Sequence, residues 1–126
     1  MDVDALLAMQ TWAVVGLSSN QGRAAWEVAE FLQHKGKRIV PVHPSAETVH
    51  GEQGYVSLRD IPFPVDVVDC FVNSSLVGAV VDDAIAVGAK GVWMQLDVVD
   101  HDAASRARDA GLIVVMDRCP KIEWRS

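Results

Sequence analysis

The chain has few cysteines, few cations and no long apolar run, and each shortage excludes a class of protein. Cys70 and Cys119 are its only cysteines in 126 residues. They lack C-x-x-C spacing, so we expect free thiols in a reducing cytosol and not a disulfide framework. The net charge of −6 argues against nonspecific binding to nucleic acid or to an anionic membrane, which needs an extended basic surface. No segment approaches the ~20 apolar residues of a membrane span, and no signal-peptide pattern is present, so we expect a cytoplasmic protein.

The sequence also lacks a recognisable catalytic or metal-binding set. His34, His50 and His101 have no further ligands at metal spacing, and a solvated surface position is the ordinary place for such histidines. Ser18 has no evident His and Asp partners that would complete a hydrolase triad. We therefore predict that the isolated chain catalyses no reaction.

What the chain does contain is enough apolar sequence for one packed domain over residues 1–126. Half of the residues are apolar and 22% are charged, which is typical of a globular domain. Five apolar runs are predicted to be strands, at 12–15, 38–42, 65–72, 91–96 and 112–116. Helical patterns separate most of them, which indicates a Rossmann-like, doubly wound α/β fold with five parallel strands. We predict the strand order 3-2-1-4-5, with ligands binding outside the carboxyl ends of the strands.

Several local sequence signals predict where the helices begin and which of their faces are buried. Asp2 or Asp4 can cap a short first helix, and a longer one begins at Ala24 or Ala25. Asn73 and Asp100 are the predicted caps of two later helices. The first of these has an apolar stripe that starts at Leu76, and the second has a core face of alanine: Ala103, Ala104, Ala107 and Ala110. Pro41 lies inside a strand, so it should lie near the strand's end or where no ladder hydrogen bond is required.

The loop that follows the first strand has the character of an anion site. Gly16 ends the strand and Gly22 lies within a polar turn that precedes a helix. The first N–H groups of a helix are unpaired and its dipole favours anions. Neither the G-x-G-x-x-G fingerprint nor a P-loop is present, so an ordinary βα turn is an equally good reading. No acidic residue occurs in 5–26 or 31–46, as an anion site formed by these two βα turns would require.

The end of the second strand bears on the class of nucleotide. A typical NAD pocket has an acidic residue there that holds the adenosine ribose, whereas this chain has Val42, His43 and Pro44, and no acid before Glu47. A ribose that carries an extra phosphate, as in coenzyme A or NADP, is compatible with His43 and Arg23. Other polar residues expected at strand ends are Asn73, Gln95 and Cys119.

Six segments together resemble a known family. They are VVGLS (14–18) with Arg23, IVPVHP (39–44), YVSLRDIP (55–62), VDVVD (65–69), GAKGVWMQL (88–96) and AGLIVVMDRCP (110–120). Their order and spacing are similar to those of the small bacterial and archaeal CoA-binding proteins, stand-alone relatives of the N-terminal domain of succinyl-CoA synthetase α subunits. The likeness extends over nearly the whole chain. The phosphorylated histidine of the synthetase belongs to a second domain that has no counterpart here, so the resemblance implies binding without catalysis.

The resemblance also implies roles for particular residues. Phosphates would lie at Gly16, Ser18 and Arg23, the adenosine side against 42–44, a third wall at 71–73, and the pantetheine end near Gln95. The full candidate set for coenzyme A is Gly16, Leu17, Ser18, Asn20, Gly22, Arg23, Val42, His43, Pro44, Phe71, Val72, Asn73, Gln95 and Cys119. This chain departs from the family in three places: His43 replaces the usual Asn, 71–73 lacks basic residues, and Asp97 replaces a Gly.

Two function classes follow. The first is a CoA or acyl-CoA binding protein without a catalytic domain, and its partner is a small molecule. The second is an NADP-type or other nucleotide-dependent enzyme domain that acts with a protein partner. The missing substrate domain and the missing dinucleotide glycines favour the first. We also consider a mixed disulfide between Cys119 and the CoA thiol, with an inert buried cysteine as the preferred alternative.

Overall fold

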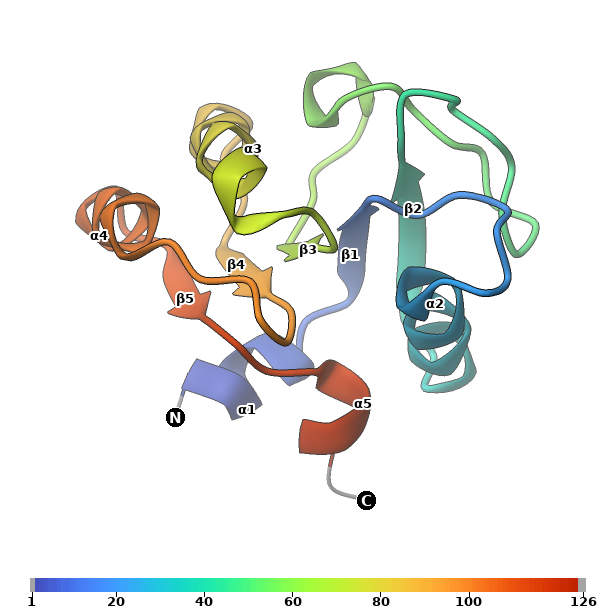
Figure 1. Ribbon diagram of the computed structural model, residues 1–126, viewed down its shortest axis with the longest axis horizontal. Coiled ribbons are helices and arrows are strands. Elements are labelled where there is room, and N and C mark those ends of the chain that lie inside the picture. The colour runs from blue at the N-terminus through green and yellow to red at the C-terminus, as the bar shows by residue number, and fades with distance from the viewer. Residues whose placement is uncertain (1, 125–126) are drawn as a thin grey trace.

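The computed structural model describes residues 2–124, and its centre is an all-parallel sheet of five strands (Figure 1). The strands are β1 (Thr11–Val15), β2 (Arg38–Val42), β3 (Val67–Cys70), β4 (Gly91–Met94) and β5 (Ile113–Val115). Each coincides with a predicted apolar run, although β3, β4 and β5 are shorter than predicted. The Rossmann-like α/β fold class is therefore confirmed.

The predicted strand order is wrong. The observed order is β2-β1-β3-β4-β5, so β3 pairs with β1 and not with β2. The reason is the face that the β2–β3 connection takes. This connection packs Tyr55, Leu58 and Ile61 on the face opposite to that of the β1–β2 helix. A right-handed crossover on that opposite face leads back past β1 and adds β3 on its other side.

Helices cover both faces of the sheet, as Figure 1 shows. One face carries α3 (Ser74–Ala86) and α4 (His101–Asp109); the other carries α1 (Asp2–Leu7), α2 (Ala24–His34) and α5 (Pro120–Glu123). The sequence pattern reveals neither α5 nor the short 3-10 turn η1 (Leu58–Asp60), because both are too brief to show a period. No helix in the part of the chain described here is long and apolar enough to cross a bilayer.

Two of the three predicted helix caps are present in the structure, whereas Asp2 and Asp4, the candidates for the first helix, lie inside α1 and not before it. The Asn73 side chain accepts a hydrogen bond from the Ser75 N–H, and the Asp100 carboxylate accepts one from the Ala103 N–H. The alanine face of α4 is buried at three of its four predicted positions, but Ala110 is exposed, because α4 ends at Asp109 and Ala110 is its C-cap. Pro41 lies in β2 at the edge of the sheet, where a missing N–H is tolerated.

The strands alternate their side chains between two buried layers. Ala13, Val15, Val68 and Met94 face α3 and α4. Trp12, Val14, Val67 and Trp93 face α1 and α2, and the two tryptophan rings lie 5.7 Å apart. Both tryptophans are fully buried, so they belong to the core. Because apolar side chains fill both layers, the polar residues that could contact a ligand are those at the carboxyl ends of the strands.

Candidate ligand-binding site

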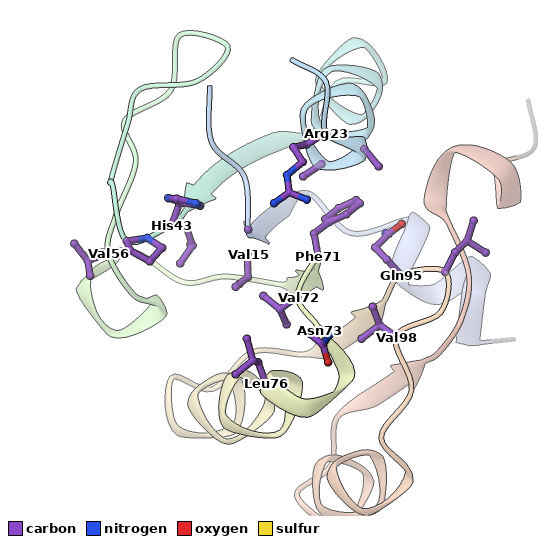
Figure 2. Close-up of a pocket in the computed structure, with 16 residues that line it drawn as sticks. Val15, Arg23, His43, Val56, Phe71, Val72, Asn73, Leu76, Gln95 and Val98 are labelled. Carbon is purple, nitrogen blue, oxygen red and sulfur yellow. The ribbon is translucent and has the colours of Figure 1, made fainter. Parts of the chain in front are cut away.

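A pocket of about 690 Å³ lies at the carboxyl ends of β1, β2, β3 and β4 (Figure 2). This volume is in the range of small-molecule sites. The pocket lies where β2 and β3 diverge on the two sides of β1, which is the switch point at which open α/β sheets bind ligands. The predicted site residues that line it are Gly16, Arg23, Val42, His43, Pro44, Phe71, Val72, Asn73 and Gln95.

Gly16 brings two strand ends close together beneath the pocket. Its φ is +101°, and a Cβ at this position would lie 2.5 Å from the Phe71 carbonyl oxygen. Its N–H donates to the Val42 carbonyl at 2.8 Å. Only glycine fits a backbone that combines a positive φ with so close a contact. The first loop therefore leaves the sheet directly against the neighbouring strands.

The rest of this loop is held by its own side chains. Asn20 Oδ1 accepts a hydrogen bond from the Gly22 N–H at 3.0 Å, and Ser18 Oγ accepts one from the Asn20 N–H at 3.3 Å. Leu17 is fully buried in the core. None of these four residues lines the pocket, so their contact with a ligand stays a prediction.

The loop places the N-terminus of α2, which has no side-chain cap, at the pocket. Arg23 is the N-cap residue of α2, and no side chain caps the helix there. Ala24 and Ala25 of the first turn line the pocket, and their small side chains leave the unpaired N–H groups accessible. In Figure 2 the Arg23 side chain reaches from this turn towards the space between His43 and Phe71. Within residues 2–124, its guanidinium forms no ion pair.

One acidic residue from outside the two acid-free segments reaches the first loop. Glu47 Oε2 accepts a hydrogen bond from Ser19 Oγ at 2.5 Å, and its Oε1 accepts one from Ser45 Oγ at 2.9 Å. These donors hold the pKa of Glu47 below its usual value. Ser45 also contacts His43 Nδ1. Glu47 thus ties the loops after β1 and β2 together, a contact between residues that are distant in sequence.

Sequence reasoning missed the apolar part of the pocket, which consists of Val15, Ala24, Ala25, Val56, Leu76, Leu96 and Val98. The sequence predicts Leu76 on the buried stripe of its helix, but it is 61% exposed; Val56 and Leu96 are also exposed, by 58% and 50%. Aliphatic side chains in these segments have the same periodicity as core residues, so the sequence offers no signal that separates them. Exposed apolar groups gathered at one rim are typical of a surface that a ligand or partner covers.

Gln95 lies at the deep end of the pocket and is almost completely buried. Its Nε2 donates to Oδ1 of Asp69 at 2.6 Å. Asp69, a residue that the sequence analysis did not single out, is fully buried within β3. Burial raises the pKa of Asp69 to about 8, although the hydrogen bond from Gln95 opposes this shift. A polar pair therefore lies behind the pocket in an otherwise apolar layer.

Two further predicted features are not part of the pocket lining. Cys119 is buried as the N-cap residue of α5 and does not line the pocket. Asp97 has a φ of +67°, so the loop after β4 keeps the conformation that glycine usually provides. The Asp97 N–H donates to Asp117 Oδ1 at 2.7 Å, and its carbonyl accepts from Ser74 Oγ at 3.2 Å. These two hydrogen bonds hold the loop in this conformation although Asp97 stands where the family usually has Gly.

Comparison with known proteins identifies the family to which this fold and pocket belong. A family described as CoA binding domain matches residues 10–125. The chain is a member of that family. A solved structure of a hypothetical protein from Pyrococcus horikoshii OT3 is 38% identical, superposes with a TM-score of 0.92, and matches 97% of this chain and 87% of its own. The uncharacterized protein YneT of Bacillus subtilis is 32% identical over 87% of this chain and 82% of its own length.

A larger relative places the domain in the context of an enzyme. The alpha subunit of ADP-forming acetate–CoA ligase II from Pyrococcus furiosus is 31% identical over 81 residues. The match covers 64% of this chain but only 18% of that subunit. The resemblance to the succinyl-CoA synthetase type of enzyme is thus confirmed for this one domain.

Proposed function

We propose that the pocket binds coenzyme A or an acyl-CoA, with the diphosphate at the start of α2. The observation that carries this proposal is the free guanidinium of Arg23 beside an uncapped helix N-terminus. A cation at this end of a helix is unfavourable against the dipole unless an anion lies beside it. Together, the helix N–H groups and the guanidinium supply charge-assisted hydrogen bonds to phosphate oxygens.

The other walls suit the remaining parts of the same ligand. His43 and Pro44 line the same pocket as Arg23, and in this proposal the adenosine lies against them. Phe71 and Val72 form the wall between this side and Gln95, and a pantetheine chain would extend along them. The exposed aliphatic rim offers apolar contact to such a chain or to an acyl group.

The proposal assigns no turnover to the chain by itself. The match to the ligase subunit is confined to one domain, and within residues 2–124 no group of side chains is suited to hold a metal ion. The partner that we propose is a small molecule, and the proposed role is that of a carrier or sensor of CoA.

Calorimetric titration with CoA, acetyl-CoA, dephospho-CoA, NAD and NADP tests the proposal. Loss of a charged hydrogen-bond contact costs about 1.5–3 kcal/mol, so Arg23→Ala should weaken CoA roughly tenfold or more. Arg108→Ala, at an exposed position of α4, removes the same charge away from the pocket and should leave affinity within about twofold. Equal binding of NAD and CoA, or normal CoA binding by Arg23→Ala, would show that the site is wrong.

A further inference from the structure

The carboxylate of Asp69 is an unusual group for its position. It lies on β3 in register with Val14 of β1 and Trp93 of β4, and both of these side chains are fully buried. Within residues 2–124, no cation pairs with it and its Oδ2 has no hydrogen-bond partner. A buried carboxyl group without a charged partner is costly. Among the described residues, the side chain to which it is hydrogen-bonded is Gln95, which lines the pocket.

We propose that Asp69 is a positioning residue that sets, through Gln95, which hydrogen-bonding group the deep end of the pocket offers to its ligand. As a carboxylate, Asp69 only accepts, so Gln95 must give its Nε2 to Asp69 and leave Oε1 for the ligand. As a carboxylic acid, Asp69 can donate to Gln95 Oε1. The amide then turns and offers its NH2 group to the ligand.

The structure supports the coupling by the isolation of this pair. The 2.6 Å distance between Gln95 Nε2 and Asp69 Oδ1 shows that the two side chains are directly hydrogen-bonded. The buried side chains that share this face are apolar except for Cys119. Burial brings the pKa of Asp69 to about 8, so both protonation states are accessible near neutral pH. Cys70, the next residue, is on the opposite face, and its own pKa is raised by burial and by the charge of Asp69.

Other charged groups on the surrounding elements lie at the surface. The Glu27–Lys121 pair joins α2 and α5, and the Arg118–Glu123 pair lies beside α5. The Lys90–Asp66 pair precedes β4 and β3, at the opposite ends of these strands from the pocket. Arg23 and His43 line the pocket itself. All of these groups are unchanged when Asp69 alone is substituted, so their titration cancels in a comparison of two variants.

This inference rests on the proposed CoA site, and CoA is the probe. Wild type and Asp69→Asn are titrated with CoA at pH 6, 7, 8 and 9. Asn has the shape of Asp and can donate to Gln95 Oε1 as the acid does, but it cannot ionise. The ratio of the two dissociation constants should be close to one at pH 6 and should depart from one by roughly three- to tenfold at pH 9, the worth of one hydrogen bond. A ratio that is constant across this range would mean a purely structural Asp69 and would overturn the inference.

Two further measurements test whether the effect acts through Gln95 and whether it is coupled to the ligand. In a Gln95→Met background, Asp69→Asn should no longer change the pH dependence of CoA affinity. Persistence of the effect would show that it does not act through Gln95 and would also overturn the inference.

In the wild type, carbon-13 NMR follows the Asp69 carboxyl directly, and saturation with CoA should move its titration midpoint by about half to one pH unit, because linkage is reciprocal. No movement would refute the coupling even if Asp69→Asn did not fold. Absence of CoA binding to wild type at every pH is a different result, which would overturn the proposed function itself.

Discussion

Replacement of Asp69 by Asn should make the protein more stable relative to wild type as the pH rises. Burial raises the pKa of Asp69 from 3.8 to about 8 in the folded chain. Between these values the folded protein holds a proton that the unfolded chain has released. A raised carboxyl pKa therefore stabilises the fold at low pH, and this stabilisation is lost as the pH increases towards 8. Asn does not ionise, so Asp69→Asn does not lose this stability as the pH rises, whereas the wild type does.

The size of the effect follows from the width of that window. Each pH unit within it changes the free energy of unfolding by up to about 1.4 kcal/mol. Between pH 5 and pH 8 the difference between Asp69→Asn and wild type should therefore rise by on the order of 4 kcal/mol. This is a large part of the 5–15 kcal/mol of a typical domain. Carboxylates with lowered pKa values, such as Glu27 and Glu47, act in the opposite direction but are common to both proteins.

Urea denaturation at pH 5, 6, 7 and 8 measures this difference. Asp109→Asn, at an exposed position, controls for the loss of one negative charge, and its difference from wild type should stay within about 0.5 kcal/mol. If the difference between Asp69→Asn and wild type is the same at every pH, Asp69 does not change its protonation state within that window. The reasoning from burial would then be refuted.

Three further predictions concern the loops and thiols around the pocket. In urea denaturation, Gly16→Ala should lower the free energy of unfolding by about 2 kcal/mol more than Gly88→Ala does. Both positions have positive φ, but only at Gly16 would a Cβ lie against backbone atoms. Equal losses of stability in the two variants would contradict the close contact at Gly16. Asp97→Gly should leave the midpoint of urea denaturation unchanged or slightly raised. Asp97→Val should lower the free energy of unfolding by about 1 kcal/mol or more, because a β-branched residue does not tolerate the φ of +67° at this position. Similar midpoints for the two variants would argue against that backbone conformation. Cys70 and Cys119, both buried, should react with a thiol reagent only after denaturation, and intact mass after exposure to oxidised CoA should be unchanged; an adduct that Cys119→Ser abolishes would instead support the mixed disulfide.

The predictable part of this fold is the part that local patterns determine. Strand and helix positions follow from apolar runs and from caps such as Asn73 and Asp100, which act within a few residues of themselves. The strand order depends on which face the long β2–β3 connection covers. That choice is made by the packing of Tyr55, Leu58 and Ile61 against distant residues, and no local pattern encodes it.

The candidate site divides in the same way. Parallel strands bring their carboxyl ends together, so polar residues such as Arg23, His43 and Gln95 were predictable as neighbours. The link between Ser19 and Glu47 joins residues 28 apart in sequence, and no local pattern in the sequence indicates it. The exposed position of Leu76 also depends on tertiary structure, because its helix pattern is equally compatible with burial.

Asp69 is the residue that the sequence could have revealed. Residues 65–72 are predicted to form a strand of a sheet that helices cover on both faces. An interior position of such a strand has no solvent-facing side, so a carboxylate there must be buried whichever face it takes. Because a buried carboxylate needs a compensating partner, that assignment already required a polar group on a neighbouring strand. Gln95 ends the fourth strand, which the predicted order 3-2-1-4-5 separates from the third, so the identity of the partner followed only from the observed pairing of β3 with β4.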